Sequence, residues 1–475
     1  MAQQLPAELL TEIFDNCSPP WHTEHRLNDD ITAAMELERL SLGYLHRLAQ
    51  VCVFWRATVL NTPQLWSTVV VDTSFWPDIN LPTETLLAVL RNTLERGQSS
   101  GLLLQVGMGD HDDATHSVAE LLCMHSHRWH HVYIWCGASH TLGLFSSAKG
   151  NLPWLHSLRV AGFLDSGLDI FETAPRLRRF LSSQDFDRIS TLAIPWHQLE
   201  WVSYTGGRHN PYYAVRGLGL MKDIGDCHLF LEGGYELKST AWETQIPVTS
   251  NLQRLTLVAE ASIEESATVL GRIFDLLTLP ALTLLYIQVS NTPALWNADR
   301  FITMAERSSF HAHLTKLEIR AIITPQEMVR CLAVLDAVKE LTIADFVTPP
   351  GNILITDALL AALSCDDDEG SKAVILPRLE QLDITTRLEF RPQTYIDFIA
   401  SRLRYLKIRS TRIPGEPLFK QYFVWVPSGG HRLDPITVLE DGLKEWIQTG
   451  ELRYTQSCCS CKQCEVALGG TLTST

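Results

Sequence analysis

Three hexapeptides in the second half of the chain share one pattern: LTKLEI at 314–319, VKELTI at 338–343 and LEQLDI at 379–384. Their apolar residues recur in the form Leu/Val-x-x-Leu-x-Ile, and the alternation at the end of each predicts a β-strand with one buried face. Related runs lie at 102–106, 131–135, 155–160, 177–181, 199–202, 227–231, 252–257, 282–287 and 403–408. Many short strands of one type indicate a repeat array.

The spacing of the strands and the segments between them predict how the array is stacked. The second apolar anchors are separated by 22 residues from Leu158 to Phe180 and by 24 residues from Leu382 to Leu406, at or just above the leucine-rich-repeat period. Helices are expected between the strands at 83–97, 113–125, 263–277, 325–337 and 356–363. Because one strand–helix unit cannot cover its own apolar face, we expect neighbours to stack into an α/β solenoid of horseshoe form.

Polar residues between the anchors would face away from the helices and line the concave side of the array. They are candidate contacts for a protein target, and the residues singled out are Arg254, Lys316, Glu318, Glu340, Asp383, Arg404 and Lys407. The alternative is that these positions are ordinary solvated strand faces, since few surface residues contribute energetically to an interface.

The first seventy residues have a helical pattern instead. LPAELLTEIF at 5–14 predicts a helix with Pro6 at its first position and with Leu9, Ile13 and Phe14 on one face. A second apolar series covers eighteen residues in five steps, the period of one amphipathic helix; it comprises Leu37, Leu40, Tyr44, Leu48, Val51 and Trp55. So small a unit cannot bury much surface alone, so its apolar stripes should pack on another surface.

Three blocks of this segment together resemble an F-box: Leu5-Pro6-x-Glu8-Leu9-Leu10-x-x-Ile13-Phe14, Val51-Cys52-x-x-Trp55-Arg56 and Thr62-Pro63-x-Leu65-Trp66. The arrangement is similar to the F-box proteins abundant in mushroom-forming fungi, in which an insertion, here about 17–36, divides the motif and irregular leucine-rich repeats follow. Phrases at 174–178 and 194–199 add to this resemblance, which covers most of the chain. The alternative is a helical hairpin with ordinary core leucines.

The resemblance implies a mixed fold: a small all-α F-box domain at 1–70, a linker helix at 71–100, an irregular leucine-rich-repeat-like α/β array at 101–430, and a C-terminal cap with a partly disordered, Cys-rich tail at 431–475. It also implies a substrate-recognition subunit that docks on the SKP-type adaptor of a cullin–RING ubiquitin ligase and holds an unknown protein substrate. The residues that would form or support the adaptor-binding face are Leu5, Pro6, Leu9, Ile13, Phe14, Val51, Cys52, Trp55 and Trp66.

Two other classes of function remain open. One is an F-box-like interaction scaffold that delivers no target for ubiquitination. The other is an enzyme, but the chain has no Gly-x-x-x-x-Gly-Lys-Ser/Thr phosphate loop, no Gly-x-Ser-x-Gly elbow and no His-Glu-x-x-His pair. We therefore predict a non-catalytic adaptor subunit with no catalytic residue and no cofactor.

Composition limits the partners and the compartment. The 475 residues are 45% hydrophobic and 20% charged, and 39 basic against 54 acidic side chains give a net charge of −15. This charge disfavours nucleic acid and anionic membranes as partners. The sequence shows neither a secretory signal nor a membrane span. Eleven mostly scattered cysteines favour a reducing compartment, the cytoplasm or the nucleus.

Metal sites are weakly indicated. Cys458, Cys459, Cys461 and Cys464 could together hold zinc or be palmitoylated, but a polar tail without a metal is the favoured interpretation. A second group comprises His125, His127, His130, His131 and His140 near Cys123 and Cys136. There His130 and His131 are expected to point to opposite faces of a strand. The loop at 206–217 and the acidic run at 366–370 are interpreted as surface segments, and no metal is predicted.

Overall fold

The computed structural model divides the described chain into two compact units, one within residues 1–205 and the other within residues 206–472. The described residues are 5–16, 43–109, 112–138, 140–162, 167–183, 192–204, 215, 217–219, 224–232, 247–260, 266–290, 296–345, 353–365, 373–409, 417–425 and 434–458. Each unit is a mixed α/β structure, and the two are described separately below.

The first unit opens with short helices around a small core of their own. These are α1 (Ala7–Asn16), α3 (Gly43–Ala49), α4 (Val53–Asn61) and the 3-10 turn η2 (Pro63–Trp66). The core consists of Leu10, Phe14, Leu45, Val59, Leu65 and Trp66, with Tyr44, Leu48, Ala49 and Trp55 packed against it. Contacts of η2 with β1 (Thr68–Asp72) and α5 (Thr83–Arg96) join this core to the sheet that follows.

The prediction of one continuous helix through Val51 and Trp55 is wrong. The chain leaves α3 at Ala49, and Cys52 is extended, with φ −162° and ψ 170°. The Sγ of Cys52 accepts a hydrogen bond from the amide of Trp55 at 3.4 Å and caps a new helix. Both helices bury apolar residues in the same core, so the 3.6-residue spacing of apolar positions continues across the break. For this reason the spacing alone did not reveal that the helix ends and a new one begins.

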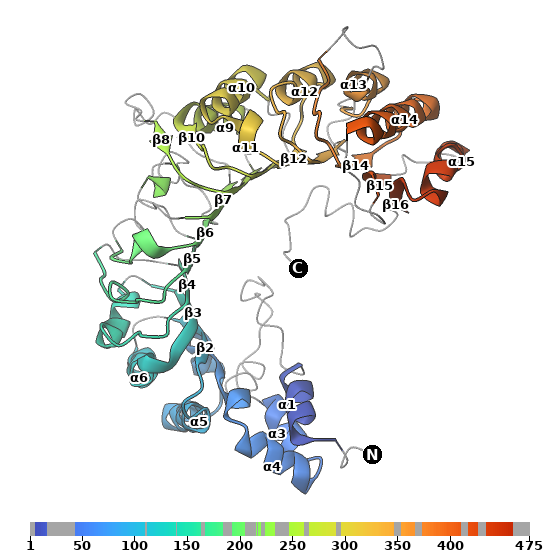
Figure 1. The fold of residues 1–475 in the computed structure, drawn as a ribbon. Coiled ribbons are helices and arrows are strands. Elements are labelled where there is room, and N and C mark those ends of the chain that lie inside the picture. Colours follow the sequence, from blue (N-terminus) through green and yellow to red (C-terminus); the bar gives the residue numbers. More distant parts are fainter. Residues whose placement is uncertain are drawn as a thin grey trace. The chain divides into compact units, whose positions relative to one another are not determined.

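The sheet of the first unit is parallel and follows chain order (Figure 1). Its strands are β1, β2 (Leu102–Met108), β3 (Trp129–Cys136), β4 (Ser157–Gly162), β5 (Arg179–Ser182) and β6 (Trp201–Tyr204). Helices α5 and α6 (Asp113–Cys123) lie on one side of it. A buried row runs across the strands in register, made by Val69, Leu104, Val132, Leu158, Phe180 and Val202. This row forms the sheet side of the core.

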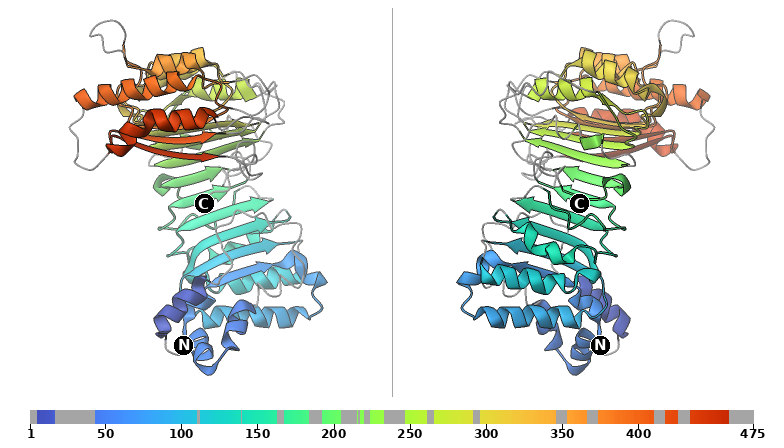
Figure 2. Two further views of the ribbon diagram at one scale, coloured as in Figure 1. Left: turned by 90° about the vertical axis from the view of Figure 1, so that its right-hand side faces the viewer. Right: turned by 90° about the vertical axis from the view of Figure 1, so that its left-hand side faces the viewer.

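The second unit repeats the arrangement, and Figure 2 shows its strands as parallel arrows. The strands are β7 (Asp226–Glu232), β9 (Arg254–Glu260), β11 (Leu284–Ser290), β12 (Lys316–Arg320), β13 (Glu340–Ala344), β14 (Gln381–Thr386), β15 (Phe419–Trp425) and β16 (Leu452–Cys458). The helices are α9 (Ser266–Leu276), α10 (Ala298–Arg307), α11 (Phe310–His313), α12 (Pro325–Leu332), α13 (Asp357–Leu363), α14 (Pro392–Arg409) and α15 (Asp434–Gln448). β8 (Val248–Thr249) and β10 (Leu277–Thr278) form a separate parallel pair.

The predicted mixed α/β architecture is confirmed, and its strands are parallel, but one predicted strand is wrong. The run at 403–408 belongs to α14, so its assignment as a strand is wrong. Leu403 and Leu406 are buried, as a strand would also require, but Ile408 is 83% exposed. The pattern Leu-x-x-Leu places two residues on one side of a helix, and it also matches the strand pattern of the repeat. So short a pattern therefore could not distinguish a helix from a strand. The parallel sheets also include β1 and β16, which lie outside residues 101–430.

Arginines tie successive helices together in both units. Arg128, Arg307 and Arg402 each donate to one backbone carbonyl in the last turn of a preceding helix, respectively α5, α9 and α13, and to another carbonyl further along the chain. The acceptors are Leu94 (2.8 Å) and Ser100 (3.0 Å) for Arg128, Phe274 (2.6 Å) and Leu277 (2.5 Å) for Arg307, and Leu363 (2.7 Å) and Leu376 (2.8 Å) for Arg402. Helix ends leave carbonyls without intrahelical partners, and these guanidinium groups satisfy them.

Candidate functional site

Helix α1 presents apolar side chains in two directions. Leu10 and Phe14 are 1% and 0% exposed, whereas Leu9 and Ile13 are 47% and 45% exposed. The prediction that Phe14 shares a face with Leu9 and Ile13 is therefore wrong. Successive residues of a helix are turned by about 100°, so Phe14 joins Leu10 four positions earlier and turns into the core. One apolar stripe of α1 is buried and the other is open.

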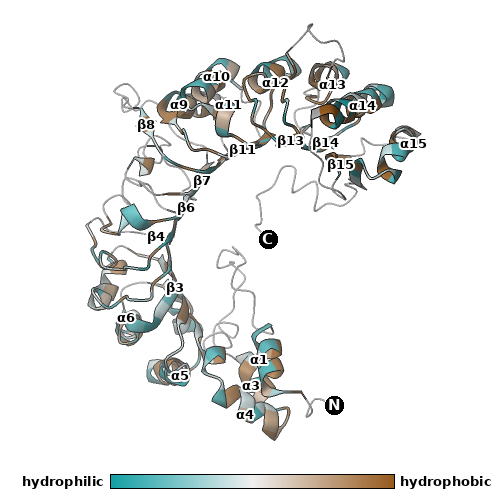
Figure 3. Cartoon of the chain, viewed as in Figure 1, coloured by the Kyte–Doolittle hydropathy of each residue, from teal (hydrophilic) through white to brown (hydrophobic). Residues whose placement is uncertain are grey.

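Helix α4 adds exposed apolar residues beside α1. Val53 is 80% exposed, although Val59 on the same helix is buried. The two helices meet at Phe14 and Trp55, whose rings pack edge to face. We define the N-terminal apolar surface as Leu5, Leu9, Ile13, Val51, Val53, Phe54 and Leu60, all exposed. Figure 3 shows the apolar segments of α1 and α4 in brown.

The structure separates the predicted adaptor-binding residues into three groups. Leu5, Pro6, Leu9, Ile13 and Val51 are exposed, Cys52 and Trp55 are half-buried, and Phe14 and Trp66 are buried. Phe14 and Trp66 pack in the core beneath the N-terminal apolar surface and are not part of that surface. Sequence reasoning missed Val53, Phe54 and Leu60, because the helix start at Cys52 that turns Val53 outward was not recognised.

Trp66 fastens these helices to the rest of the first unit. Its indole Nε1 donates to the carbonyl of Val59 at 2.8 Å, and the guanidinium of Arg96 on α5 lies 4.5 Å from the centre of its ring. The side chain is 2% exposed and is held on both sides. The orientation of the N-terminal helices on α5 therefore depends on this residue.

The candidate target-binding residues on the strands of the second unit lie on the sheet face opposite the helices, here called the open face. Their charges are mostly neutralised by oppositely charged neighbours. Lys316 Nζ and Glu340 Oε2, on neighbouring strands, are 2.9 Å apart, and this bond raises the pKa of Lys316. Arg254 pairs with Asp226 at 3.0 Å, and Glu318 with Arg320 at 2.8 Å. The pKa of Asp383 is raised by burial, and its carboxylate accepts from Gln381.

Arg404 and Lys407 are not on this face, which corrects the prediction made for them. Both are exposed residues of helix α14, because the run at 403–408 is helical. Lys407 Nζ forms an ion pair with Glu451 at 2.7 Å. These two residues therefore have no common surface with Lys316 and its neighbours on the strands.

The open face of the first unit carries residues of a different kind. It presents His131, Tyr133 and Trp135 from β3, Arg159 from β4, Arg179 from β5 and Trp201 from β6. We call these six residues the arginine–aromatic face. Sequence reasoning named none of the six as a target contact, although the alternation that identified Lys316 applies equally to Arg159 in the strand Ser-Leu-Arg-Val-Ala-Gly.

The prediction that His130 and His131 point to opposite faces of β3 is wrong. The register of β2 and β3 shifts here, with Leu102 opposite Trp129 and Leu103 opposite His131, so the strand bulges at His130. The two rings are 4.4 Å apart, and the ring of His156 lies 5.8 Å from each. Burial, helped by His156 and Arg176, lowers the pKa of His130.

Within the described residues, no group of three or more His, Cys, Asp or Glu side chains is arranged to hold a metal ion. Of the four C-terminal cysteines, Cys458 ends β16, and Cys459, Cys461 and Cys464 lie outside the described residues. Nearly all of the loop at 206–217 and the acidic residues 366–370 also lie outside them.

Across the part of the chain that the structure describes, no helix has both the length and the apolar character that crossing a bilayer requires. No protein-family model matches the chain, and no curated protein matches it significantly.

Proposed function

We propose that this chain is the substrate-recognition subunit of an SKP–cullin–F-box ubiquitin ligase in the cytoplasm or nucleus. The N-terminal helices would dock on the SKP-type adaptor, and the strand–helix array would hold a protein target. The observation that carries the proposal is the N-terminal apolar surface, which stays exposed although the helices beneath it already bury a complete apolar core. A second support is the resemblance of three blocks within residues 5–66 to an F-box.

The exposure of these residues is the physical argument for a partner. Burying one valine, leucine or isoleucine side chain contributes about 1.5–3 kcal/mol, and α1 and α4 leave several of them in water. Single exposed apolar residues are common, but clusters mark interaction surfaces. Phe14, Leu10 and Val59 already fill the interior, so Ile13 and Val53 are not needed there.

Such a subunit would act by proximity without catalysing any bond change. Holding a target lysine beside the ubiquitin carrier raises the effective concentration of the two reactants. A packed parallel sheet suits this role because it holds its exposed side chains in a fixed arrangement, and Arg128, Arg307 and Arg402 fasten the helices that cover the sheet within each unit.

The test is binding of the purified full chain to an SKP-type adaptor. We expect Ile13→Asp and Val53→Asp to abolish binding while the thermal unfolding of the chain is unchanged. The matched controls are Ile447→Asp and Val438→Asp, which place the same substitutions at exposed positions of α15. Wild-type protein that does not bind the adaptor, or variants that bind like the controls, would overturn the proposal.

Target turnover separates the ligase role from a scaffold role. Proteins captured by proximity labelling in the native cell should have longer half-lives when the gene is deleted. If none does while adaptor binding is intact, the chain is a scaffold that uses the same docking surface.

A further inference from the structure

The arginine–aromatic face is built from two rows of side chains in register. One row contains His131, Ser157, Arg179 and Trp201, and the next contains Tyr133, Arg159, Leu181 and Ser203. Diagonal neighbours on adjacent strands are about 7–8 Å apart, so Arg159 and Arg179 present two guanidinium groups within reach of one short segment. Tyrosine, tryptophan and arginine are also the residues that most often dominate binding energy at interfaces.

Each of these arginines is held by an aromatic ring. The guanidinium carbon of Arg159 lies 4.5 Å from the ring centre of Tyr133, and that of Arg179 lies 4.7 Å from the ring centre of Trp201. The Nε of Arg159 is buried and has no acceptor among the described residues. The rings therefore hold both guanidinium groups on the strand face without neutralising their charge, which stays available to an anion.

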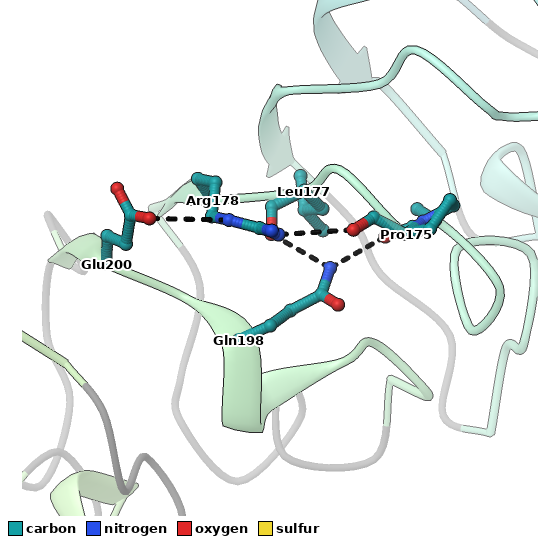
Figure 4. Close-up of polar contacts among 6 residues, drawn as sticks. Pro175, Leu177, Arg178, Gln198 and Glu200 are labelled. Atoms are coloured by element: carbon teal, nitrogen blue, oxygen red, sulfur yellow. Dashed lines mark hydrogen bonds and ion pairs between the residues drawn. The ribbon is translucent and has the colours of Figure 1, made fainter.

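Arg178, the residue directly before Arg179, is by contrast a guanidinium group with hydrogen-bond and ion-pair partners in the chain itself (Figure 4). Arg178 Nε pairs with Glu200 at 3.3 Å, and Arg178 Nη1 donates to the carbonyl of Pro175 at 3.2 Å. Gln198 donates to the carbonyl of Leu177 at 2.9 Å and fixes the approach to β5. Within the described residues, no carboxylate pairs with Arg159 or Arg179.

The charge of this face is positive although the whole chain is acidic. Strands β1 to β6 contain one acidic residue, Asp72, and it is buried and bound to the amide of Ser74 at 3.0 Å. On the open face of the second unit, by contrast, Lys316 and Arg254 are neutralised by carboxylates beside them. Two uncompensated arginines next to aromatic rings therefore complement an anionic partner with apolar side chains.

We propose that the arginine–aromatic face binds an anionic peptide segment of a target protein, with carboxylates or phosphates on Arg159 and Arg179 and an aromatic or aliphatic side chain against Trp135 or Trp201. The inference deepens the proposed function by naming the class of target and moves the expected contact from the second unit to the first. Guanidinium groups bind carboxylates and phosphates with paired hydrogen bonds, so both anions fit the same positions.

The test uses the full chain and fluorescence anisotropy with three labelled peptides of one design. One is rich in aspartate around a tyrosine, one has asparagine at every aspartate, and one has phosphoserine at those positions. We expect binding of the aspartate or the phosphoserine peptide and none of the asparagine peptide. Arg159→Gln with Arg179→Gln should lower the affinity at least about tenfold, the effect of losing a charge-assisted hydrogen bond.

A charge-matched control removes two arginines elsewhere. Arg300 and Arg330 lie on α10 and α12 and pair with Asp275 and Asp299. Arg300→Gln with Arg330→Gln changes the net charge equally, and we expect less than about a twofold loss for such distant surface charges. Equal losses in both double variants would show general electrostatic attraction and overturn the proposal.

Two further outcomes would also overturn it. Loss of peptide binding only in Arg254→Gln with Lys316→Gln would place the site on the second unit. Concentration-dependent dimerisation of the wild type that Arg159→Gln with Arg179→Gln abolishes would identify a second copy of the chain as the occupant. Adaptor binding, measured separately, should be unaffected in the Arg159 and Arg179 variants, so failure of this inference and failure of the proposed function are distinguishable.

Discussion

The ring of Phe14 packs edge to face against the ring of Trp55, with centroids 4.9 Å apart and ring planes at 62°. This contact joins α1 to α4, two helices that are distant in sequence. The residue beside Phe14, Ile13, is exposed on the other side of α1. Two adjacent apolar residues therefore have different roles, one in stability and one at the surface.

Truncating Phe14 should destabilise the N-terminal helices, whereas truncating Ile13 should not. We expect Phe14→Ala to cost about 3–5 kcal/mol, because a buried aromatic ring leaves a cavity, and Ile13→Ala to stay within about 0.5 kcal/mol. Hydrogen exchange of the amides in α1 and α4 measures both. Similar protection in the two variants would show that the helices do not share the core described here.

Removing Arg128 should loosen the end of α5. Arg128→Met leaves the buried carbonyl of Leu94 and the half-buried carbonyl of Ser100 without their donor, and the two unsatisfied acceptors together cost about 2–4 kcal/mol. Amide exchange in α5 should rise accordingly. Arg91→Met, at an exposed position of the same helix, is the control and should leave exchange unchanged. If both variants behave alike, the hydrogen bonds of Arg128 do not hold this helix.

Two glycines with the same backbone conformation should respond differently to alanine. Gly162 has φ +84°, and a Cβ added there would lie 2.0 Å from the carbonyl oxygen of Cys136 on the neighbouring strand. Gly150 has φ +79°, with open space around it. Gly150→Ala should cost about 1–2 kcal/mol for its left-handed conformation alone. Gly162→Ala should cost more and lower the thermal unfolding temperature further; an equal drop would contradict the close approach of β3 and β4.

Stability of the first unit should fall as the pH drops through the ordinary histidine pKa of 6.5. Burial lowers the pKa of His125, helped by Arg128 and His127 and opposed by Glu95, and burial with His156 and Arg176 lowers the pKa of His130. Below pH 6.5 the unfolded chain gains protons that the folded unit does not accept, so unfolding becomes more favourable until the folded pKa values are passed.

The variants His125→Gln and His130→Gln test this pH dependence. Denaturation monitored between pH 7.5 and about 5 should show a smaller loss of stability in the double variant than in the wild type. An unchanged slope would mean that other groups control the pH response of this unit.

Most strands and several helices could be predicted because their signals are local. Alternation in LTKLEI predicted β12, and Pro325 after Thr324 marked the start of α12, where Thr324 and Glu327 form a capping box. β15 was missed because Gln421 occupies the buried position that Leu382 holds in β14. A polar residue there interrupts the apolar pattern, although the side chain is fully buried.

The candidate site was predictable only in part. The blocks containing Leu9, Ile13 and Val51 pointed to an apolar surface, and these residues are exposed. Because the break at Cys52 was not predicted, the exposure of Val53 was not predicted either. The sequence also did not show that Lys316 and Glu340 would form an ion pair across neighbouring strands. Pairing of this kind depends on the register of strands more than twenty residues apart.

The amino-acid sequence by itself determined the succession of strands and helices, because the periods of 2 and 3.6 residues are properties of neighbouring positions. Which of two chemically similar neighbours enters a core, Leu9 or Leu10, Ile13 or Phe14, was decided only when α1 met α4 and η2. The same holds for Arg159 and Arg179, since their separation from carboxylates comes from the in-register stacking of β3 to β6. The type of each side chain is known from the sequence, but the residues that it contacts on neighbouring strands depend on how the strands pack.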